Sequence, residues 1–210
     1  MSEGIIGVVG GVGPYAGLDL VKKIFDQTIA KTDQDHLSVC LISESRKVPD
    51  RTQYLKGELQ ENPGYAIAKL LQKLEKAGAK VAAVACNTAH SPKIFDVVIE
   101  QMEKEKSSLR LFHIVEETVK FIKKNLPNIN NVGILGTKGT IETNLYGSVV
   151  EREGLVAINP DDEILDSVHR AIYDLDYGIK AQSNPVSDKA REDVRIAIKH
   201  LQNLGAQGII

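Results

Sequence analysis

Short apolar runs rich in β-branched residues alternate with stripes of apolar residues at helical spacing along almost the whole chain. The runs indicate strands, and the stripes between them indicate helices. The expected strands cover residues 5–9, 37–42, 81–85, 109–114 and 131–136. The expected helix starts are Asn62-Pro63, Ser91-Pro92, Thr140, Asn159-Pro160 and Ser187. Repeated strand–helix units with short connections predict parallel sheets flanked by helices, an α/β fold.

Parts of the sequence occur twice. Residues 7–13 (GVVGGVG) align with residues 133–139 (GILGTKG) at an offset of 126, each as a strand, a glycine turn and a helix start. A second match, at an offset of 127, joins Leu74, Gly78 and Ala79 to Leu201, Gly205 and Ala206. Two matches at nearly the same offset predict two similar α/β lobes. The alternative, that α/β units look alike in any case, stays open.

The repeat also predicts the lobe boundaries. We expect a first lobe at residues 1–104, completed by residues from about 205 onward, and a second lobe at residues 105–204. Residues 208–210 have the pattern of a buried strand. The second copy of the segment around Cys86 would begin just past Ile210. We therefore expect that copy to lie beyond the residues given.

Composition excludes several classes of protein. Lys plus Arg number 26 against 28 Asp plus Glu, so the chain has no excess of positive charge with which to bind nucleic acid. Its apolar runs are shorter than the roughly 20 residues that span a membrane. Residues 1–4 contain no Lys or Arg, unlike a secretory signal. Two cysteines form neither a disulfide framework nor a four-thiolate zinc site. We expect a cytoplasmic protein with no nucleic-acid or membrane partner.

The glycine turn after the first strand is the first candidate binding element. Gly11, Gly13 and Ala16 have the G-x-G-x-x-A spacing of dinucleotide-binding folds. That fold also needs an acidic residue about 20 positions later, whereas Glu44 is farther along and Pro14 removes an amide donor. A dehydrogenase therefore stays the weaker alternative. The turn around Gly11 either binds a small carboxylate or only makes a tight corner.

The segment Ala85 to Pro92 is the strongest candidate for catalysis. Cys86 follows a buried strand and precedes a helix start, and ligands bind at that edge of open α/β sheets. A helix N-terminus stabilises negative charge, so a thiol there can act as a base or a nucleophile. Asn87 and Thr88 can hydrogen-bond a carboxylate or an amine. His90 is either a second acid/base group or a residue that orients the loop.

The remaining cysteine and histidines are not assigned to catalysis. Cys40 lies within an apolar strand with no polar cluster beside it, so we expect a small core residue. The other histidines have no metal-ligand spacing, and no metal site is expected. They are His36, His113, His169 and His200.

Two basic residues are candidates for binding carboxylates. Arg51 lies in an expected loop after the second strand, and its planar guanidinium suits a carboxylate. Lys180 follows Gly178 and could reach a second carboxylate. Each could equally be a solvated surface residue.

Together these segments resemble the aspartate/glutamate racemase family. The resemblance rests on Gly10 to Pro14, Pro49 to Thr52, Ala85 to His90 and Leu135 to Thr140. It implies two α/β lobes related by a pseudo-twofold axis, and cofactor-independent racemisation of an acidic amino acid, aspartate before glutamate. It also implies a homodimer. A cysteine from each lobe would face opposite sides of Cα, and Cys86 would be one of them.

The resemblance also implies substrate contacts for five residues of this chain. They are Arg51, Asn87, Thr88, Thr137 and Lys180. The second cysteine of the family would follow Ile210, and Cys40 is in the wrong place to substitute for it. Two alternatives therefore stay open. One is a related cysteine-dependent isomerase or decarboxylase of dicarboxylic acids, and the other is a non-catalytic protein that binds carboxylates.

Overall fold

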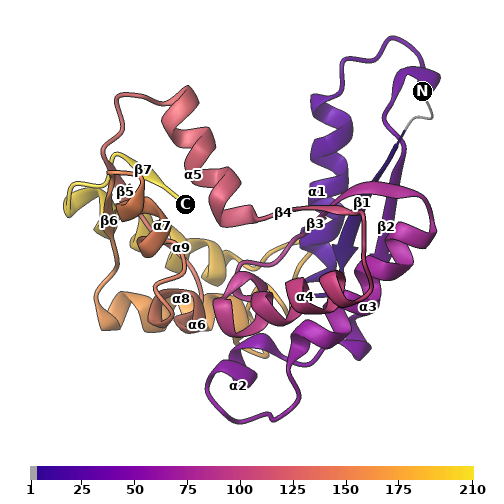
Figure 1. Ribbon diagram of the computed structural model, residues 1–210. Helices are drawn as coiled ribbons and strands as arrows, with labels where there is room; N and C mark the ends of the chain where they lie inside the picture. The colour runs from indigo at the N-terminus through magenta and orange to yellow at the C-terminus, as the bar shows by residue number, and fades with distance from the viewer. Residues whose placement is uncertain (1–3) are drawn as a thin grey trace. The chain divides into compact units, whose positions relative to one another are not determined.

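The computed structural model describes residues 4–210 as two compact α/β units (Figure 1). Along the sequence, the boundary between them lies between Ile114 and Val115. The argument against a secretory signal used residues 1–4. Of these, residues 1–3 lie outside the described residues. The sequence analysis expected the units to meet ten residues earlier. That boundary is wrong because β4, after residue 104, pairs with β3 in the first sheet.

Each unit contains a parallel sheet, as the sequence predicted. The strands are β1 (Ile5–Gly10), β2 (Val39–Ser43), β3 (Ala79–Val84), β4 (Arg110–Phe112), β5 (Asn131–Gly133), β6 (Val156–Ile158) and β7 (Gly208–Ile209). The helices are α1 (Pro14–Gln27), α2 (Arg51–Leu55), α3 (Pro63–Lys76), α4 (Pro92–Lys104), α5 (Ile114–Asn125), α6 (Lys138–Glu142), α7 (Gly147–Arg152), α8 (Asp162–Tyr173) and α9 (Asp188–Asn203). Strand β6 and helices α2, α5 and α7 were not anticipated from the sequence.

The first sheet has the order β2-β1-β3-β4, with every pair parallel. Crossovers between parallel strands are right-handed. The chain moves along the sheet in one direction from β1 to β2 and in the opposite direction from β2 to β3, so the helices of these two crossovers cover opposite faces. Helix α1 accordingly packs on one face, where Gly17 approaches Gly10. Helix α3 packs on the other face, against α4 (Figure 1). Both faces of β1 are thereby covered, which explains its unbroken apolar sequence.

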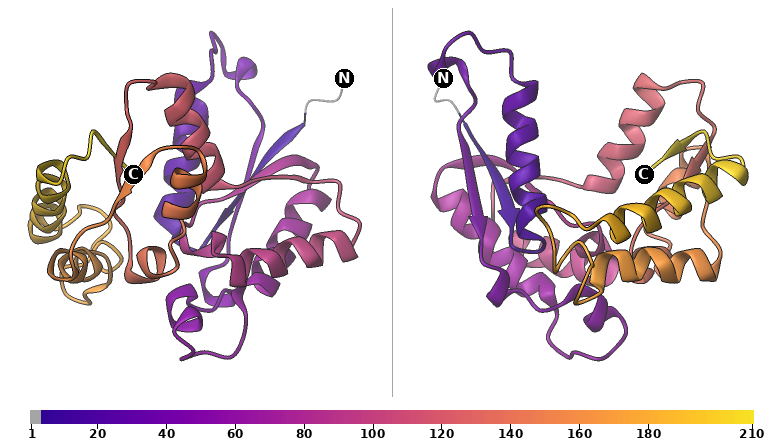
Figure 2. Two further views of the ribbon diagram at one scale, coloured as in Figure 1. Left: turned by 60° about the vertical axis from the view of Figure 1, so that its left-hand side comes forward. Right: turned by 180° about the vertical axis from the view of Figure 1, so that it is seen from behind.

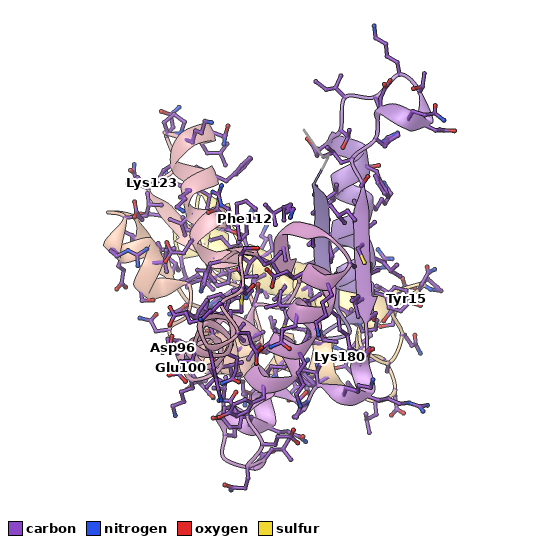
Figure 3. All side chains as sticks on the ribbon, turned by 45° about the vertical axis from the view of Figure 1, so that its right-hand side comes forward. Tyr15, Asp96, Glu100, Phe112, Lys123 and Lys180 are labelled. Atoms are coloured by element: carbon purple, nitrogen blue, oxygen red, sulfur yellow. The ribbon has the colours of Figure 1, made fainter. Side chains whose placement is uncertain are left out.

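Local signals set the two long helices of the first unit. The Asn62 side chain accepts a hydrogen bond from the Gly64 amide at 2.8 Å, the N-cap predicted from Asn62-Pro63. Helix α3 buries Ile67, Leu71 and Leu74 in the core. Helix α4 buries an apolar stripe and turns Asp96 and Glu100 to solvent (Figure 3). In α1, by contrast, the apolar residues at helical spacing are only partly covered, and Leu18 retains 54% of its accessible surface.

The second sheet has the order β6-β5-β7, again parallel. Helices α8 and α9 pack side by side (Figure 2), and Ser187 caps α9 by accepting from the Ala190 amide, as predicted. Strand β7 pairs with β5, so the expectation that residues from about 205 onward complete the first unit is wrong. In this pairing Gly208 of β7 lies opposite Val132 of β5.

The internal repeat is visible as one contact repeated in both units. A Cβ built on Gly7 would lie 3.1 Å from Leu74 Cδ1 and 3.2 Å from Ala79 Cβ. A Cβ built on its counterpart Gly133 would lie 3.1 Å from both Leu201 Cδ1 and Ala206 Cβ. These are the residues that the two sequence offsets pair. The repeat therefore reflects one packing arrangement, a helix end held close to the first strand of each sheet.

No helix among residues 4–210 is both long enough and apolar enough to cross a membrane.

Alanine at position 7 or 133 tests the repeated contact. An alanine in a strand is ordinarily more stable than a glycine by roughly 0.5–1 kcal/mol. Here the added methyl group would lie 3.1–3.3 Å from three side-chain carbons, so the helix end and the strand must move apart slightly, and we expect Gly7→Ala and Gly133→Ala each to lower the free energy of unfolding by about 1 kcal/mol. Urea unfolding followed by circular dichroism measures the change. A variant as stable as the wild type would contradict the close approach.

Candidate functional site

Three loops of the first unit begin at the same edge of its sheet. Parallel strands end side by side, and the register places Gly10 of β1 opposite Ser43 of β2, and Val9 opposite Val84 of β3. Gly11 therefore follows the central strand, and Cys86 follows its neighbour by two residues. Ligands of open α/β sheets bind at this carboxyl-terminal edge. The edge carries five of the seven residues predicted for the site.

Gly11 gives the first loop its shape. Its φ of +82° lies in the left-handed region, and a Cβ there would stand 2.7 Å from the Glu44 amide nitrogen. The turn therefore packs directly on the backbone that follows β2. Glu44 is bound to the ammonium groups of Lys47 and Lys73, which hold the pKa of its carboxyl below the usual value. Its carboxylate is therefore already paired with two ammonium groups.

Arg51 is the first residue of α2 rather than a residue of a loop. It retains only 8% of its accessible surface, so the prediction of a possible solvated arginine is wrong. Its guanidinium donates to the carbonyl oxygens of Val12 at 3.0 Å and Pro49 at 3.2 Å. Arg51 thus ties the glycine turn to the loop after β2. Its Nε has no hydrogen-bond partner, and no carboxylate among residues 4–210 forms an ion pair with it.

The loop after β3 holds Cys86 by its backbone. The Cys86 amide donates to the Val84 carbonyl at 2.9 Å, and its carbonyl oxygen lies 2.8 Å from Nδ1 of His90. The side chain is half-buried and packs on one side against the core. A short 3₁₀ helix, Thr88–His90, follows and contacts α2, the helix that begins with Arg51. The loop therefore places the buried Thr88, two residues after Cys86, in the short helix that contacts the helix of Arg51.

His90 lies under this loop, with 1% of its surface exposed. Burial is the largest cause that lowers its pKa, from 6.5 to about 4, and the nearby His113 lowers it further. The carbonyl groups of Cys86 and Phe112 act in the opposite direction. A carbonyl oxygen only accepts, so the neutral ring carries its hydrogen on Nδ1 and donates to Cys86. This geometry supports the loop-orienting alternative over the acid/base alternative for His90.

The other two predicted residues belong to the second unit. Thr137 precedes α6, and its hydroxyl lies 3.2 Å from the hydroxyl of Thr140. Lys180 lies in the loop between α8 and α9 (Figure 3), with Nζ 3.6 Å from the centre of the Tyr173 ring. The Tyr173 ring stacks on His169, whose Nδ1 accepts from the Lys138 amide at 3.4 Å.

His169 and Tyr173 thus join the segment after β5 to the loop of Lys180, and the sequence analysis missed both. They are four residues apart on α8, so their helical spacing was a usable signal.

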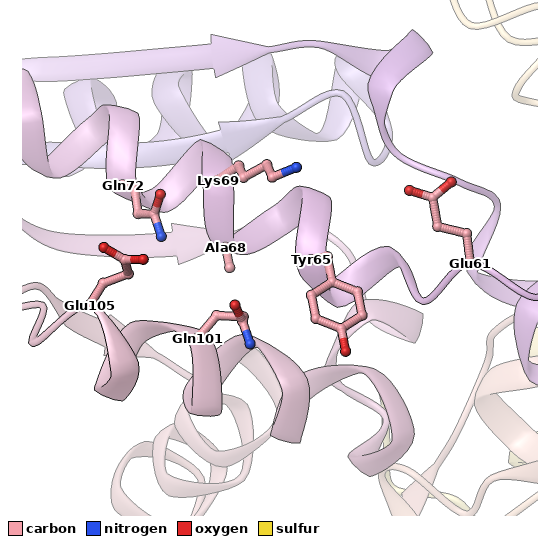
Figure 4. A pocket seen from close by; sticks show the side chains of 7 residues that line it. All are labelled: Glu61, Tyr65, Ala68, Lys69, Gln72, Gln101 and Glu105. Carbon is pink, nitrogen blue, oxygen red and sulfur yellow. The ribbon is translucent and has the colours of Figure 1, made fainter.

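A separate hollow of about 360 Å³ lies between α3 and α4 (Figure 4). Its lining is mostly polar and comes from Glu61, Tyr65, Ala68, Lys69, Gln72, Gln101 and Glu105. None of the predicted residues lines it. Within residues 4–210 no three His, Cys, Asp or Glu side chains are grouped as metal ligands.

Comparison with known proteins gives one consistent family. The family model for Asp/Glu/hydantoin racemases matches residues 9–210. The broad specificity amino-acid racemase RacX of Bacillus subtilis is 29% identical over 162 residues, which cover 75% of this chain and 65% of RacX. A glutamate racemase of Helicobacter pylori is 30% identical over 81 residues, 38% of this chain and 29% of the relative. The matched region thus spans less than two thirds of either relative.

Solved structures show the same fold. The aspartate racemase of Picrophilus torridus is similar with a TM-score of 0.78 and 25% identity, over 98% of this chain and 79% of that one. An aspartate racemase homologue of Pyrococcus horikoshii has a TM-score of 0.68 and 23% identity, over 97% and 82% of the two chains. The second likeness concerns the fold alone.

Alanine at Gly11 tests the close packing of the glycine turn, and Gly57 supplies a matched control. Both residues have φ near +80°, so each alanine variant carries the left-handed strain of roughly 1 kcal/mol. Only at Gly11 does the new Cβ also meet backbone atoms; at Gly57 nothing lies within 4 Å. We expect Gly11→Ala to be the more destabilising variant by at least about 1 kcal/mol in urea unfolding. Equal losses would contradict the packing described.

Acid should destabilise the first unit through His90. Between pH 6.5 and about 4 the unfolded chain takes up a proton at this position and the folded chain does not. The free energy of unfolding therefore falls as the pH decreases through this window, by on the order of 3 kcal/mol. The pH dependence of urea unfolding measures it, with His90→Asn as the control that lacks this titration. Identical pH profiles for the two proteins would contradict the burial effect.

Proposed function

The chain belongs to the Asp/Glu/hydantoin racemase family, and from this premise we propose that it exchanges the Cα hydrogen of an acidic amino acid and so interconverts its enantiomers. We propose aspartate as the preferred substrate and glutamate as the alternative. RacX and the Helicobacter pylori glutamate racemase match over less than two thirds of their own lengths, so the proposal is also argued from the site itself.

The buried charge of Arg51 is the observation that carries the proposal. An arginine in the interior is costly unless an anion compensates it. The two carbonyl groups that it binds orient the guanidinium but supply no negative charge, and Nε has no hydrogen-bond partner. A substrate carboxylate would supply that charge at the edge of the sheet. Its planar geometry matches the guanidinium fork.

Cys86 would carry out the proton transfer. The hydrogen on Cα of an amino acid is weakly acidic, and a carboxylate held by a cation stabilises the carbanion that its loss creates. The Cys86 thiolate would take this proton and become a thiol, while the electron pair of the C–H bond moves onto Cα and the carboxylate. Return of the proton to the same face regenerates the starting enantiomer. Delivery of a proton to the opposite face gives the mirror image.

Delivery to the opposite face needs a second acid, and Cys40 does not qualify. It lies within β2, opposite Gly7 of β1, where its side chain packs against the core. The family resemblance assigns this role to a second thiol, which is not among residues 1–210, whose two cysteines are Cys40 and Cys86. The half of the reaction that these residues carry is therefore exchange at one face of Cα.

Other parts of the proposal rest on the resemblance alone. Asn87, Thr88 and the Gly11 turn would hold the amino and carboxyl groups from the first unit. Thr137 and Lys180 would contribute from the second, with Lys180 directed to the second carboxylate. We further propose that the reaction needs no cofactor, and that the protein is a cytoplasmic homodimer.

Deuterium exchange at Cα tests the proposal directly. L- and D-aspartate and L- and D-glutamate are incubated separately with the 210-residue chain in heavy water, and proton NMR follows the Cα signal. We expect exchange of one enantiomer of aspartate, and a loss of at least about 1,000-fold in Cys86→Ser because the base is removed. Chiral chromatography should show inversion much slower than exchange.

The Cys40→Ser variant is the matched control, since it removes the other thiol and should leave exchange unchanged. Exchange that survives Cys86→Ser would show that the base lies elsewhere. Inversion as fast as exchange would show that a second acid is present among these residues. Thermal stabilisation by aspartate without exchange would favour the non-catalytic alternative.

A further inference from the structure

Both backbone polar groups of Cys86 are fixed. Its amide donates to Val84, two residues earlier, at 2.9 Å, so the chain turns sharply as it leaves β3. Its carbonyl oxygen accepts from Nδ1 of His90, four residues later, at 2.8 Å. The first bond is made by the backbone itself. The second depends on the His90 side chain, and it closes a hydrogen-bonded loop of five residues that begins at Cys86.

The His90 ring is held rigidly in the position that makes this bond. It is stacked on Phe95 of α4, with ring centres 4.9 Å apart, and meets the edge of His113 at 4.6 Å. The 3₁₀ turn Thr88–His90 directs residue 90 back toward residue 86, since the His90 amide donates to Asn87. Ser91, the next residue, is also buried. The ring therefore has no exposed position available without disrupting this packing.

An apolar side chain would satisfy the packing at position 90 better than histidine does. The Nε2 atom of His90 is buried without a hydrogen-bond donor, because the Phe112 carbonyl near the ring can only accept and cannot satisfy an unprotonated Nε2. An unsatisfied buried acceptor is unfavourable, and leucine or phenylalanine would have none. What histidine supplies and those residues lack is the Nδ1–H donor to Cys86. Without it the Cys86 carbonyl would lose its partner at the edge of the sheet.

We propose that His90 is a positioning residue for the reaction: through the hydrogen bond from Nδ1 to the Cys86 carbonyl, it fixes where the Cys86 thiol stands. The inference rests on the proposed function for its catalytic consequence. His90 does not exchange protons with the substrate in this role. It remains a neutral donor whose effect reaches the reaction through the backbone of Cys86.

The expected effect is on turnover rather than on binding. Displacing a catalytic group by about 1 Å can cost on the order of 100-fold in rate. The carboxylate of the substrate would be held by Arg51 and its loop, which do not involve the His90 donor. Loss of the donor should therefore lower kcat and leave KM nearly unchanged.

Asparagine and leucine at position 90 isolate the donor. The Asn amide nitrogen occupies the place of Nδ1, and leucine has the same branched shape without a donor. We expect His90→Leu to lose about 30- to 100-fold in kcat for Cα exchange with KM within about threefold, and His90→Asn to stay within about fivefold of the wild type. The pH profile of kcat should be the same for His90→Asn and the wild type, since no proton transfer is lost.

Each other outcome overturns the inference. A folded His90→Leu protein with wild-type kcat would show that the donor is unimportant. Equal losses in the two variants would show that only packing matters. A changed pH profile in His90→Asn would show that His90 is an acid/base group. If His90→Leu does not fold, His90→Gln, whose amide lies one carbon farther out, takes its place with the same expectation.

A second measurement separates failure of this inference from failure of the proposed function. If the wild type exchanges no acidic amino acid, the proposed function fails. The rate of Cys86 alkylation by iodoacetamide, measured in a Cys40→Ser background, then reports the thiol position directly. The rate should change by at least about threefold in His90→Leu and by less in His90→Asn. Equal rates in all three proteins would overturn the inference.

Discussion

The position of the site depends on one constraint, the parallel pairing of β1 with both of its neighbours. Because β1 lies between β2 and β3 in register, three loops start at the same edge of the first sheet. Gly11, Arg51 and Cys86 are far apart in sequence, and this pairing is what gathers their segments. Covering both faces of β1 with helices leaves that edge as the place where polar groups can reach a ligand.

The same constraint explains the internal repeat. A strand covered by a helix needs a small residue where the two come closest, and Gly7 and Gly133 occupy that point in the two units. Leucines at the ends of α3 and α9 fill the space that each glycine leaves. The repeated glycine and leucine are therefore the trace of a helix–strand spacing kept in both units.

Features set by neighbouring residues could be predicted from the sequence, and features set by distant residues could not. The caps Asn62 and Ser187 were found because capping is a local pattern. The exposure of Leu18 could not be predicted, because periodicity identifies a helix but not which residues pack on it. Strand β7 was assigned to the wrong sheet, since a short apolar run does not identify its partner. The burial of Arg51 was missed for the same reason, because its hydrogen bond to Val12 spans 39 positions.

Arg51 and His90 show how the edge is built. Loops that follow parallel strands leave carbonyl groups that no strand neighbour satisfies, and a buried carbonyl needs a donor. Arg51 supplies donors to Val12 and Pro49, and His90 supplies one to Cys86. The difference between them lies in charge. His90 is neutral when its donor is used, whereas Arg51 keeps its positive charge after orienting two loops. The residue that assembles the edge is therefore also the one that would attract a carboxylate to it.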